Sequence, residues 1–293
     1  MSKIAIFGAS GYLGKSIVRA AIEKGVAVVA FVRDRQGFQQ GEFADVETRA
    51  VCFNKNKPLS GKLDDCSGII STLGITKQKD GLSYDEVDYR INACILREAE
   101  ITSIEKFMFV SVYKGDTFKD VALCKAKERF VRELSVSTVS SVIIRPTGFY
   151  SDMLDFLKMA KSGKVHLFGS GEQKLNPISG DDLAIEMLKI LQNDWESKSN
   201  RSINIGGPKT LSHRQIAKLA FLALKRPIII KTHPDWLRKL SLMFGRFFIP
   251  QKLFGPYEFF LTAMGEDMNT DEYGTQSLYV FFKQQALKLE NRT

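Results

Sequence analysis

Seven residues close to the N-terminus, GASGYLG at 8–14, restrict the fold of this chain more than any other stretch. They follow a short apolar run, KIAIF at 3–7, and they precede a segment over 12–24 whose apolar residues recur with the period of a helix. In such a loop the first glycine permits a tight turn, the second lets the backbone approach a pyrophosphate, and the third allows close packing of helix on strand. The helix N-terminus adds free N–H groups and a partial positive charge. This order of strand, glycine loop and helix predicts a dinucleotide-binding site.

Apolar runs and helical segments alternate along the first half of the chain. Strands are predicted at 27–33, 48–53, 67–73, 106–112 and 139–145, and helices over about 84–100 and 118–135. After Pro146 the pattern changes to short strands and turns at 164–179, a helix at 181–193 and a strand at 201–207. We therefore expect an α/β fold. It has a Rossmann-like doubly wound parallel sheet in residues 1–146, and a smaller C-terminal α/β substrate lobe in residues 147–293 that returns elements to the main sheet.

Composition excludes several classes of protein. The net charge of +9 does not indicate nucleic-acid binding, because the 42 lysines and arginines are spread along the chain with no arginine-rich arm or recognition motif. The four cysteines form no CxxC pair and have no histidine at ligand spacing, so neither a metal site nor a disulfide framework is predicted. The first apolar run is too short for a signal peptide, and no apolar stretch has transmembrane length. We expect a cytoplasmic protein without a transmembrane segment, as a monomer or homodimer.

One segment of the C-terminal half, PDWLRKLSLMFGRFFIPQKLF at 234–254, has an unusual pattern. Its apolar residues share one helical face, and its basic residues lie elsewhere. The apolar residues are Trp236, Leu240, Met243 and Phe247, and the basic ones are Arg238, Lys239 and Arg246. We expect a helix that packs on the body of its own lobe. The alternatives are that it contacts a membrane surface peripherally or that it lines an apolar substrate pocket.

The end of the second predicted strand indicates which dinucleotide binds. A carboxylate there would bind a ribose 2′-hydroxyl, but the sequence is FVRDR at 31–35, with Arg33 first and Arg35 two residues later. A guanidinium suits a 2′-phosphate, so NADP(H) is favoured as the cofactor. Asp34 between the arginines keeps NAD(H) as the less favoured alternative, and a solvated surface charge is the alternative for Arg35.

Longer stretches carry motifs of a known family. They are STLGITKQKDGLSYDEVDYRIN at 71–92, KFMFVSV at 106–112, AKERFVREL at 126–134, IIRPTGFYSDM at 143–153 and LFGSGEQKLNPISGDDLA at 167–184. With the glycine loop, they resemble the atypical short-chain dehydrogenase/reductases, specifically the NmrA-like NAD(P)-binding family, over nearly the whole chain. The resemblance implies a Rossmann-like sheet, a bound nicotinamide dinucleotide and a C-terminal lobe that holds a second ligand. The glycine loop, the strand ends and the resemblance together predict the cofactor-binding residues Gly8, Ser10, Gly11, Tyr12, Leu13, Gly14, Arg33, Thr72, Leu73, Gly74, Lys127, Pro146, Gly148 and Phe149.

The resemblance also implies catalytic positions. Ser111 matches the family's active-site serine or threonine, and Lys127 matches its lysine. In related reductases that lysine depresses the pKa of a tyrosine four residues earlier, which becomes a proton donor. This chain has Leu123 at that position, and a leucine cannot donate a proton. The neighbouring Cys124 reads as a buried thiol. Tyr113 is a candidate substitute, with a ring packed at the strand end as its alternative reading.

A further candidate is Asn92, on the helix after the fourth strand. It resembles an active-site asparagine that positions the lysine through water in the wider superfamily. A plain surface residue within a helix is the alternative reading for this position.

Two functions fit these residues. The first is an NADP-dependent reductase that transfers hydride to a small, apolar carbonyl, quinone or enone substrate, with a proton from Tyr113, from water held by Ser111 and Lys127, or from the substrate. The second is a non-catalytic NADP(H)-sensing regulator or assembly factor that acts through a protein partner, which the absent tyrosine supports. A sugar-nucleotide epimerase is less favoured, because that chemistry depends most on the missing tyrosine.

Overall fold

The computed structural model of this chain describes residues 2–53, 59–75, 81–102, 104–193, 195 and 200–290. The chain forms two compact units. The first comprises Met1–Arg145 and Leu183–Ile203, and the second comprises Pro146–Asp182 and Asn204–Thr293. Within the described ranges no helix is both long enough and apolar enough to cross a membrane.

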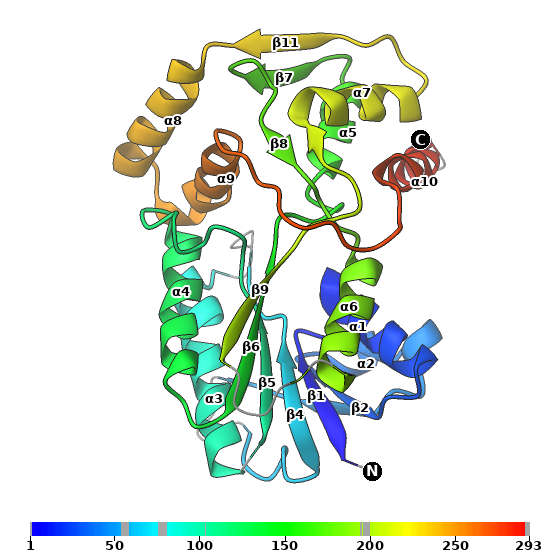
Figure 1. The fold of residues 1–293 in the computed structure, drawn as a ribbon, viewed down its shortest axis with the longest axis vertical. Coiled ribbons are helices and arrows are strands. Elements are labelled where there is room, and N and C mark those ends of the chain that lie inside the picture. The colour runs from blue at the N-terminus through cyan, green and yellow to red at the C-terminus, as the bar shows by residue number, and fades with distance from the viewer. Residues whose placement is uncertain are drawn as a thin grey trace. The chain divides into compact units, whose positions relative to one another are not determined.

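A seven-stranded sheet, ordered β3–β2–β1–β4–β5–β6–β9, is the basis of the first unit (Figure 1). Its strands are β1 (Lys3–Phe7), β2 (Val28–Val32), β3 (Thr48–Ala50), β4 (Cys66–Ser71), β5 (Lys106–Val110), β6 (Ser140–Pro146) and β9 (Arg201–Ile205). Every pairing from β3 to β6 is parallel, so the predicted Rossmann-like parallel sheet is confirmed. Since β1 lies between β2 and β4, the strand order reverses there, and open α/β sheets bind ligands at the carboxyl ends of strands beside such a reversal.

Helices cover both faces of this sheet. They are α1 (Tyr12–Glu23), α2 (Arg35–Phe38), α3 (Asn92–Ile101), α4 (Ala122–Ser135) and α6 (Gly180–Gln192), with a 3-10 turn, η1 (Gly41–Phe43), and a π-helix, η2 (Asp85–Ile91). Figure 1 shows α3 and α4 on one side of the sheet and α1 on the other. The helix predicted over 84–100 is therefore a π-helix continued by an α-helix. The helix predicted over 118–135 begins later, at Ala122, because Val121 has an extended backbone.

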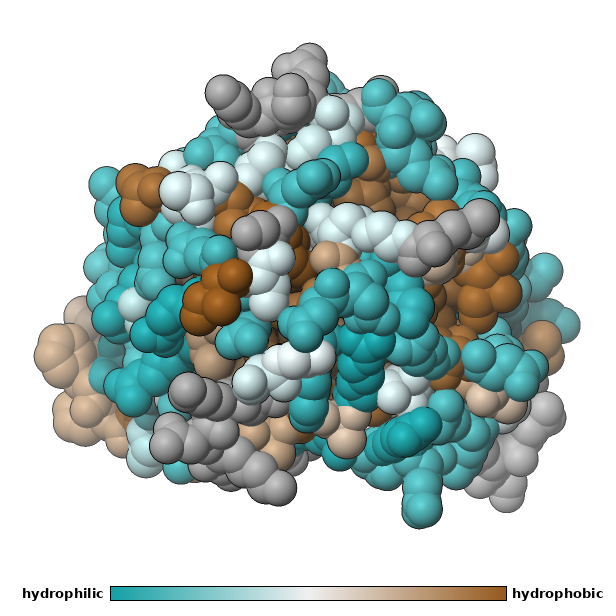
Figure 2. Space-filling model, turned by 90° about the horizontal axis from the view of Figure 1, so that it is seen from below, coloured by the Kyte–Doolittle hydropathy of each residue, from teal (hydrophilic) through white to brown (hydrophobic). Residues whose placement is uncertain are grey.

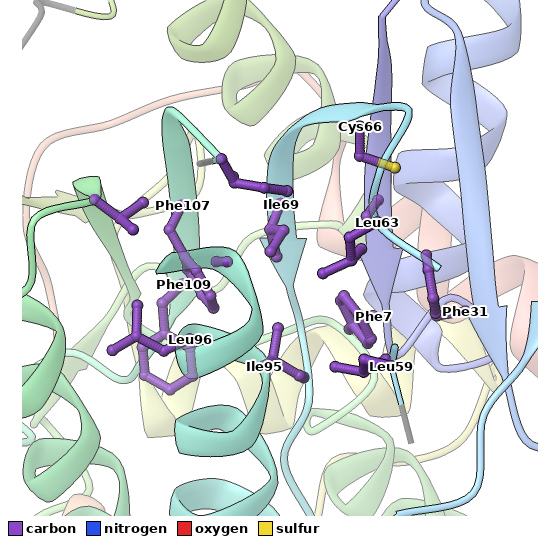
Figure 3. Close-up of a cluster of buried hydrophobic side chains, with 14 of the residues drawn as sticks. Phe7, Phe31, Leu59, Leu63, Cys66, Ile69, Ile95, Leu96, Phe107 and Phe109 are labelled. Atoms are coloured by element: carbon purple, nitrogen blue, oxygen red, sulfur yellow. The ribbon is translucent and has the colours of Figure 1, made fainter. Parts of the chain in front are cut away.

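The main core of the first unit lies against the strands at the middle of this sheet. Figure 3 shows its side chains, which come from β1, β2, β4, β5, α3 and the turns before β4: Phe7, Phe31, Leu59, Leu63, Cys66, Ile69, Ile95, Leu96, Phe107 and Phe109. Phe7 and Phe31 stack with their ring centroids 4.4 Å apart. Strands covered on both faces are apolar along most of their length, which explains their continuous hydrophobic runs. The packing fixes Phe7 and Phe31 at the ends of β1 and β2, where the candidate site begins.

The second unit is mainly helical. Its elements are α5 (Leu154–Lys161), β7 (Val165–Phe168), β8 (Lys174–Leu175), β10 (Leu211–Ser212), α7 (His213–Ala223), β11 (Ile230–His233), α8 (Asp235–Phe248), α9 (Gln251–Ala263) and α10 (Leu278–Glu290). Two small sheets join distant parts of it, because β8 pairs with β10 and β7 pairs with β11. Ser212 and Gln215 form a reciprocal capping box that begins α7. Buried Asn176 bonds to the backbone of Gly207 and Thr270 and so ties together loops that are distant in sequence.

The apolar segment at 234–254 differs from the prediction of one helix packed on its own lobe. It forms α8 and the start of α9, because the chain turns at Ile249 and Pro250. The predicted apolar face is not buried: Trp236 is 60% exposed and Phe247 is 81% exposed. The helical period predicted the helix correctly, but the period of apolar residues does not show which face of a helix packs against the rest of the protein.

Figure 2 shows the molecule from below the view of Figure 1. This face is mainly hydrophilic, and its hydrophobic residues lie in small groups between polar and charged ones. Scattered exposed apolar residues of this kind are ordinary on a protein surface and do not by themselves indicate a binding site.

Candidate functional site

The glycine loop has no room for a side chain at Gly8 or Gly14. Gly8 has a φ of +80°, and a Cβ there would lie 2.6 Å from Thr72 Oγ1. A Cβ on Gly14 would lie 2.1 Å from the Gly8 carbonyl oxygen, a backbone atom that cannot move aside cheaply. The Gly11 N–H donates to that same oxygen at 2.9 Å and closes the turn. The loop thus has the tight turn and the close helix packing that the glycine spacing predicts.

Helix α1 begins at this loop with an uncapped N-terminus. Its N-cap is Gly11, no side chain caps it, and its first turn contains no acidic residue. The first N–H groups of a helix have no partner within the helix, and they carry a partial positive charge. Leu13 and Gly14 are buried, while Ser10 is exposed. The Leu13 side chain therefore packs inward, beside backbone N–H groups that can bind an anion.

A cavity of about 230 Å³ lies over the carboxyl ends of β1, β2 and β4. Seven of the predicted cofactor-binding residues line it: Gly8, Ser10, Gly11, Arg33, Thr72, Leu73 and Gly74. Its other lining residues were not predicted: Phe7, Phe31, Val32, Val51, Phe53, Ile75, Leu82, Val87 and Ile91. A signal existed for Val51 and Phe53, because they end the third predicted strand, and β3 pairs with β2. The cavity joins a polar glycine loop to an apolar wall.

Of the three charged residues in FVRDR, Arg33, Asp34 and Arg35, only Arg33 lines this cavity. Asp34 instead caps α2, because its Oδ1 accepts from the Gly37 N–H at 3.0 Å. Arg35 points elsewhere, since its Nε donates to Thr48 Oγ1 at 2.9 Å and to Gln39 Oε1 at 3.2 Å. The three charged side chains therefore diverge, and the guanidinium of Arg33 is the one that can meet a ligand in the cavity.

Lys127 lies directly behind the cavity wall. Its Nζ is 3.1 Å from Asp88 Oδ1, and it also donates to the Val110 carbonyl oxygen at 3.1 Å. Asp88 has no exposed surface, and its Oδ2 accepts from the Ile75 N–H at 3.3 Å. Burial raises the pKa of Asp88, and the Lys127 cation opposes that rise. A Cβ on Gly74 would lie 2.8 Å from Lys127 Nζ, so only a glycine lets the cavity wall approach this ion pair.

Ser111 belongs to a second buried network. Its Oγ donates to Glu128 Oε1 at 2.9 Å. Arg145 donates to both oxygens of Glu128, at 2.6 and 2.7 Å, which is the bidentate geometry that arginine favours. All three residues are less than 10% exposed. The hydroxyl proton of Ser111 is therefore committed to Glu128, while its oxygen can still accept a hydrogen bond.

Asn92 is fully buried, so reading it as a surface residue is wrong. Its Oδ1 accepts from Ser71 Oγ at 2.6 Å, and its Nδ2 donates to the carbonyl oxygens of Val87 and Asp88 at 3.2 and 3.1 Å. These carbonyls belong to the π-helix η2, and a π-helix leaves the regular α-helical bonding pattern. Asn92 thus joins η2 to the end of β4 and holds the turn that carries Asp88.

The remaining catalytic candidates lie apart from these networks. Leu123, at the position of the family tyrosine, is 5% exposed, and Cys124 is fully buried. Tyr113 is half-buried in the turn after β5, with its ring centroid 6.0 Å from Lys114 Nζ. None of the predicted catalytic residues Asn92, Ser111, Tyr113 and Lys127 is in the lining of the cavity, as the described residues define it.

Three predicted cofactor-binding residues belong to the C-terminal side of the chain. Pro146 ends β6. Gly148 accepts through its carbonyl oxygen from the Ile178 N–H at 2.8 Å, and the Phe149 N–H donates to Asp152 Oδ2 at 3.0 Å. These bonds fix the backbone that follows β6 within the second unit.

Comparisons with known proteins agree with this geometry. A family model described as NAD(P)H-binding matches residues 8–194. The chain is 27% identical over 256 residues to divinyl chlorophyllide a 8-vinyl-reductase of Oryza sativa subsp. indica, which is 78% of this chain and 60% of the relative's length. It is 24% identical over 216 residues to photosystem II assembly factor Ycf39 of Guillardia theta, which is 73% of this chain and 68% of that protein.

Among solved structures, the NADPH-dependent quinone oxidoreductase QOR2 of Escherichia coli, complexed with NADPH, superimposes with a TM-score of 0.76. The match covers 98% of this chain and 100% of that one at 15% identity, and at that identity it shows the fold alone. The predicted resemblance to an NAD(P)-binding reductase family is confirmed. Because the matched region, residues 8–194, is more than half of the chain, this protein belongs to the NAD(P)H-binding family.

Proposed function

We propose that this protein binds NADP(H) and transfers hydride from it to a small, conjugated substrate such as an enone, a quinone or a vinyl group. The observation that carries the proposal is the cavity at the strand-order reversal, which joins the glycine loop and the N-terminus of α1 to Arg33. Loop N–H groups and a helix N-terminus suit a pyrophosphate. The nicotinamide supplies the hydride when it is bound, so the chain need only hold and orient the reactants.

The choice of NADP(H) over NAD(H) rests on the charges around the cavity. Arg33 lines it, and a guanidinium can bind a 2′-phosphate through two hydrogen bonds. Asp34, which could accept from a 2′-hydroxyl, instead accepts from the Gly37 N–H. The apolar wall that includes Val51 and Phe53 suits the adenine ring.

The substrate class follows from the missing proton donor. Leu123 stands where the family's tyrosine would protonate an alkoxide, and it is buried. Hydride addition to an isolated ketone leaves a basic alkoxide that requires an acid in the site. Addition to a conjugated double bond or a quinone leaves a delocalised anion, which can take its proton later from water. The curated relative named as a vinyl-reductase and the structural neighbour named as a quinone oxidoreductase fit this class.

Calorimetric titration with NADPH and NADH tests the cofactor assignment. We expect Arg33→Ala to weaken NADPH binding about tenfold to a hundredfold, because a charge-assisted bond to phosphate contributes roughly 1.5–3 kcal/mol, and to leave NADH binding nearly unchanged. Arg97→Ala is the matched control, since Arg97 is exposed on α3 and does not line the cavity. Equal losses for both dinucleotides would contradict the assignment of Arg33.

Oxidation of NADPH, followed at its nicotinamide absorbance with a panel of enones, quinones and aldehydes, tests the reaction. Turnover with conjugated acceptors and none with simple aldehydes is the expected result. A protein that binds NADPH tightly but oxidises it with no acceptor would instead be the non-catalytic assembly factor or regulator. Buried Leu123 and the hydroxyl of Ser111, committed to Glu128, favour that second candidate, and the relative named as an assembly factor is consistent with it.

A further inference from the structure

The second unit carries an exposed apolar surface that dinucleotide binding does not use. It is formed by α8, the turn after it and the first half of α9. We call it the α8–α9 surface, and its apolar residues are Trp236, Leu240, Met243, Phe244, Phe247, Phe248, Ile249, Leu253 and Tyr257. Each of them is at least 37% exposed. Exposed apolar patches of this extent mark sites of interaction with another surface.

The two helices pack together through their other sides. Gly245 of α8 lies against the ring of Phe254 in α9, where even a Cβ would be 2.0 Å from a ring carbon. Arg238 is 8% exposed, pairs with Asp235 at 2.7 Å and donates to the Leu261 carbonyl oxygen at 2.9 Å. The contact between α8 and α9 is thus made by Gly245 against the Phe254 ring, by the hydrogen bond from Arg238 to the Leu261 carbonyl oxygen, and by the ion pair of Arg246 with Glu258 at 2.8 Å. The apolar face is not needed for this contact and points away from it.

The most exposed part of the surface is the C-terminal end of α8, just before the turn at Ile249 and Pro250. Phe247 and Phe248 are adjacent in sequence, yet they are 81% and 76% exposed. Side chains of consecutive helical residues point about 100° apart, so the exposed surface at the end of α8 is at least that wide. Ile249 and Leu253 continue this surface at 46% and 65% exposed. Large exposed apolar side chains of this kind can enter the boundary between the headgroups and the acyl chains of a bilayer.

The charges around these side chains are positive. The stretch 243–257 contains Arg246 and Lys252 and no aspartate or glutamate. The nearest carboxylate along α9, Glu258, is 2% exposed and is bonded by Arg246 at 2.8 Å. Lys239 on α8 is 73% exposed in its side chain and lies 3.6 Å from Asp235, a carboxylate that also pairs with Arg238. The four cations of 235–258 therefore face two carboxylates, and the surface keeps a positive net charge. An apolar surface with exposed cations beside it has the chemistry that anionic lipid headgroups attract.

We propose that the α8–α9 surface docks on an anionic lipid bilayer. Phe247 and Phe248 enter the boundary between headgroups and acyl chains, and Lys239 and Lys252 meet the headgroup phosphates. The contact is peripheral, because no helix in the described part of the chain has the length and apolar character to span a membrane. The proposal does not depend on which dinucleotide is bound or on whether it is oxidised.

Co-sedimentation with vesicles tests the proposal. Vesicles of equal parts phosphatidylglycerol and phosphatidylcholine should bind the protein at least about tenfold more tightly than pure phosphatidylcholine vesicles, and salt should weaken that binding. Phe247→Ser with Phe248→Ser should lower the affinity about tenfold or more, because two large apolar groups leave the bilayer. The matched control is Leu222→Ser, which removes a 52% exposed leucine from α7 of the same unit and should not change the affinity.

A second variant separates lipid binding from folding. Lys239→Glu with Lys252→Glu leaves every apolar residue in place and should abolish the preference for anionic vesicles. NADPH titration of both double variants must match the unmodified protein, so that failure here is distinct from failure of the proposed cofactor site. Absence of vesicle binding, or equal binding to neutral and anionic vesicles, would overturn the proposal. A dimer in sedimentation velocity that Phe247→Ser with Phe248→Ser dissociates, without vesicle binding, would assign the surface to a second copy instead.

Discussion

Replacing Lys127 by Met tests whether this lysine stabilises the fold of the first unit. Its cation lies 3.1 Å from Asp88, a carboxylate with no exposed surface. Removing one partner of a buried ion pair typically costs about 3–5 kcal/mol, because the other charge loses its compensation. Met keeps the length and apolar character of the lysine side chain, which reaches to 5.1 Å from the Phe109 ring centroid. We expect Lys127→Met to lower the free energy of unfolding by about 3 kcal/mol or more.

A double-mutant cycle isolates the pair. Asp88→Asn alone leaves the Lys127 cation without its carboxylate, so this variant should also be destabilised. Combining the two substitutions removes both charges and should recover most of the loss, with a coupling free energy of about 2 kcal/mol or more. Urea unfolding followed by circular dichroism measures each free energy. Lys125→Met is the control, because Lys125 is exposed on the same helix and its replacement should cost at most about 0.5 kcal/mol.

The pH dependence gives an independent check on the same pair. Burial raises the pKa of Asp88 above its ordinary value of 3.8, and without Lys127 that pKa rises further. A carboxyl whose folded pKa is raised keeps its proton where the unfolded chain has released it, so stability falls as pH rises above 3.8. The deficit of Lys127→Met should therefore shrink towards pH 3.8. A single variant as stable as the unmodified protein, or a double variant no more stable than the single one, would refute the reasoning.

Two further predictions concern the glycine loop and the second unit. Gly14→Ala sets a Cβ 2.1 Å from the Gly8 carbonyl oxygen, so we expect NADPH affinity, measured by fluorescence titration, to fall about tenfold or more. Burial lowers the pKa of His213 to about 4 from an ordinary 6.5. Between pH 6.5 and 4 the imidazole is therefore protonated in the unfolded chain but not in the folded one. The contribution of His213 to the free energy of unfolding is fully present above pH 6.5 and should fall by roughly 3 kcal/mol as the pH drops towards 4. Calorimetric unfolding of His213→Phe should show a smaller loss over this range.

The sheet and the glycine loop could be predicted because their causes are local in sequence. Gly8 and Gly14 are required by backbone contacts within a few residues, and such contacts leave a fixed spacing. The buried strands follow from apolar runs, such as KFMFV in β5, that only a sheet covered on both faces can bury. Arg33 was found for the same reason, since it directly follows β2. The cytoplasmic location and the monomeric or dimeric state have no such local cause here and stay predictions.

Side-chain partners could not be predicted, because they are distant in sequence. Asn92 bonds to Ser71, 21 residues earlier, and no periodicity records that contact. Ser111 donates to Glu128, 17 residues later, so its proton is committed in a way that its position alone does not show. The prediction that the apolar face of 234–254 packs on its own lobe was wrong for a related reason. A helical face with Trp236 and Phe247 has the same sequence pattern whether it packs on a core or is exposed to an outside partner.

The residue at position 123 affects the proposed hydride transfer more than any of these residues, because it decides whether the site has a proton donor. Leu123 is 5% exposed and lies one turn before Lys127 on α4, so an apolar side chain packs at the position where the resemblance to short-chain reductases predicts a proton donor. Lys127 meanwhile has the buried carboxyl group of Asp88 as its partner at 3.1 Å. A lysine without a tyrosine can bind or stabilise an anion, but it has no acid to activate. In the function we propose, the chain therefore supplies no proton to the hydride adduct. The best substrate is one whose adduct is a delocalised anion, because such an anion can take its proton later from water.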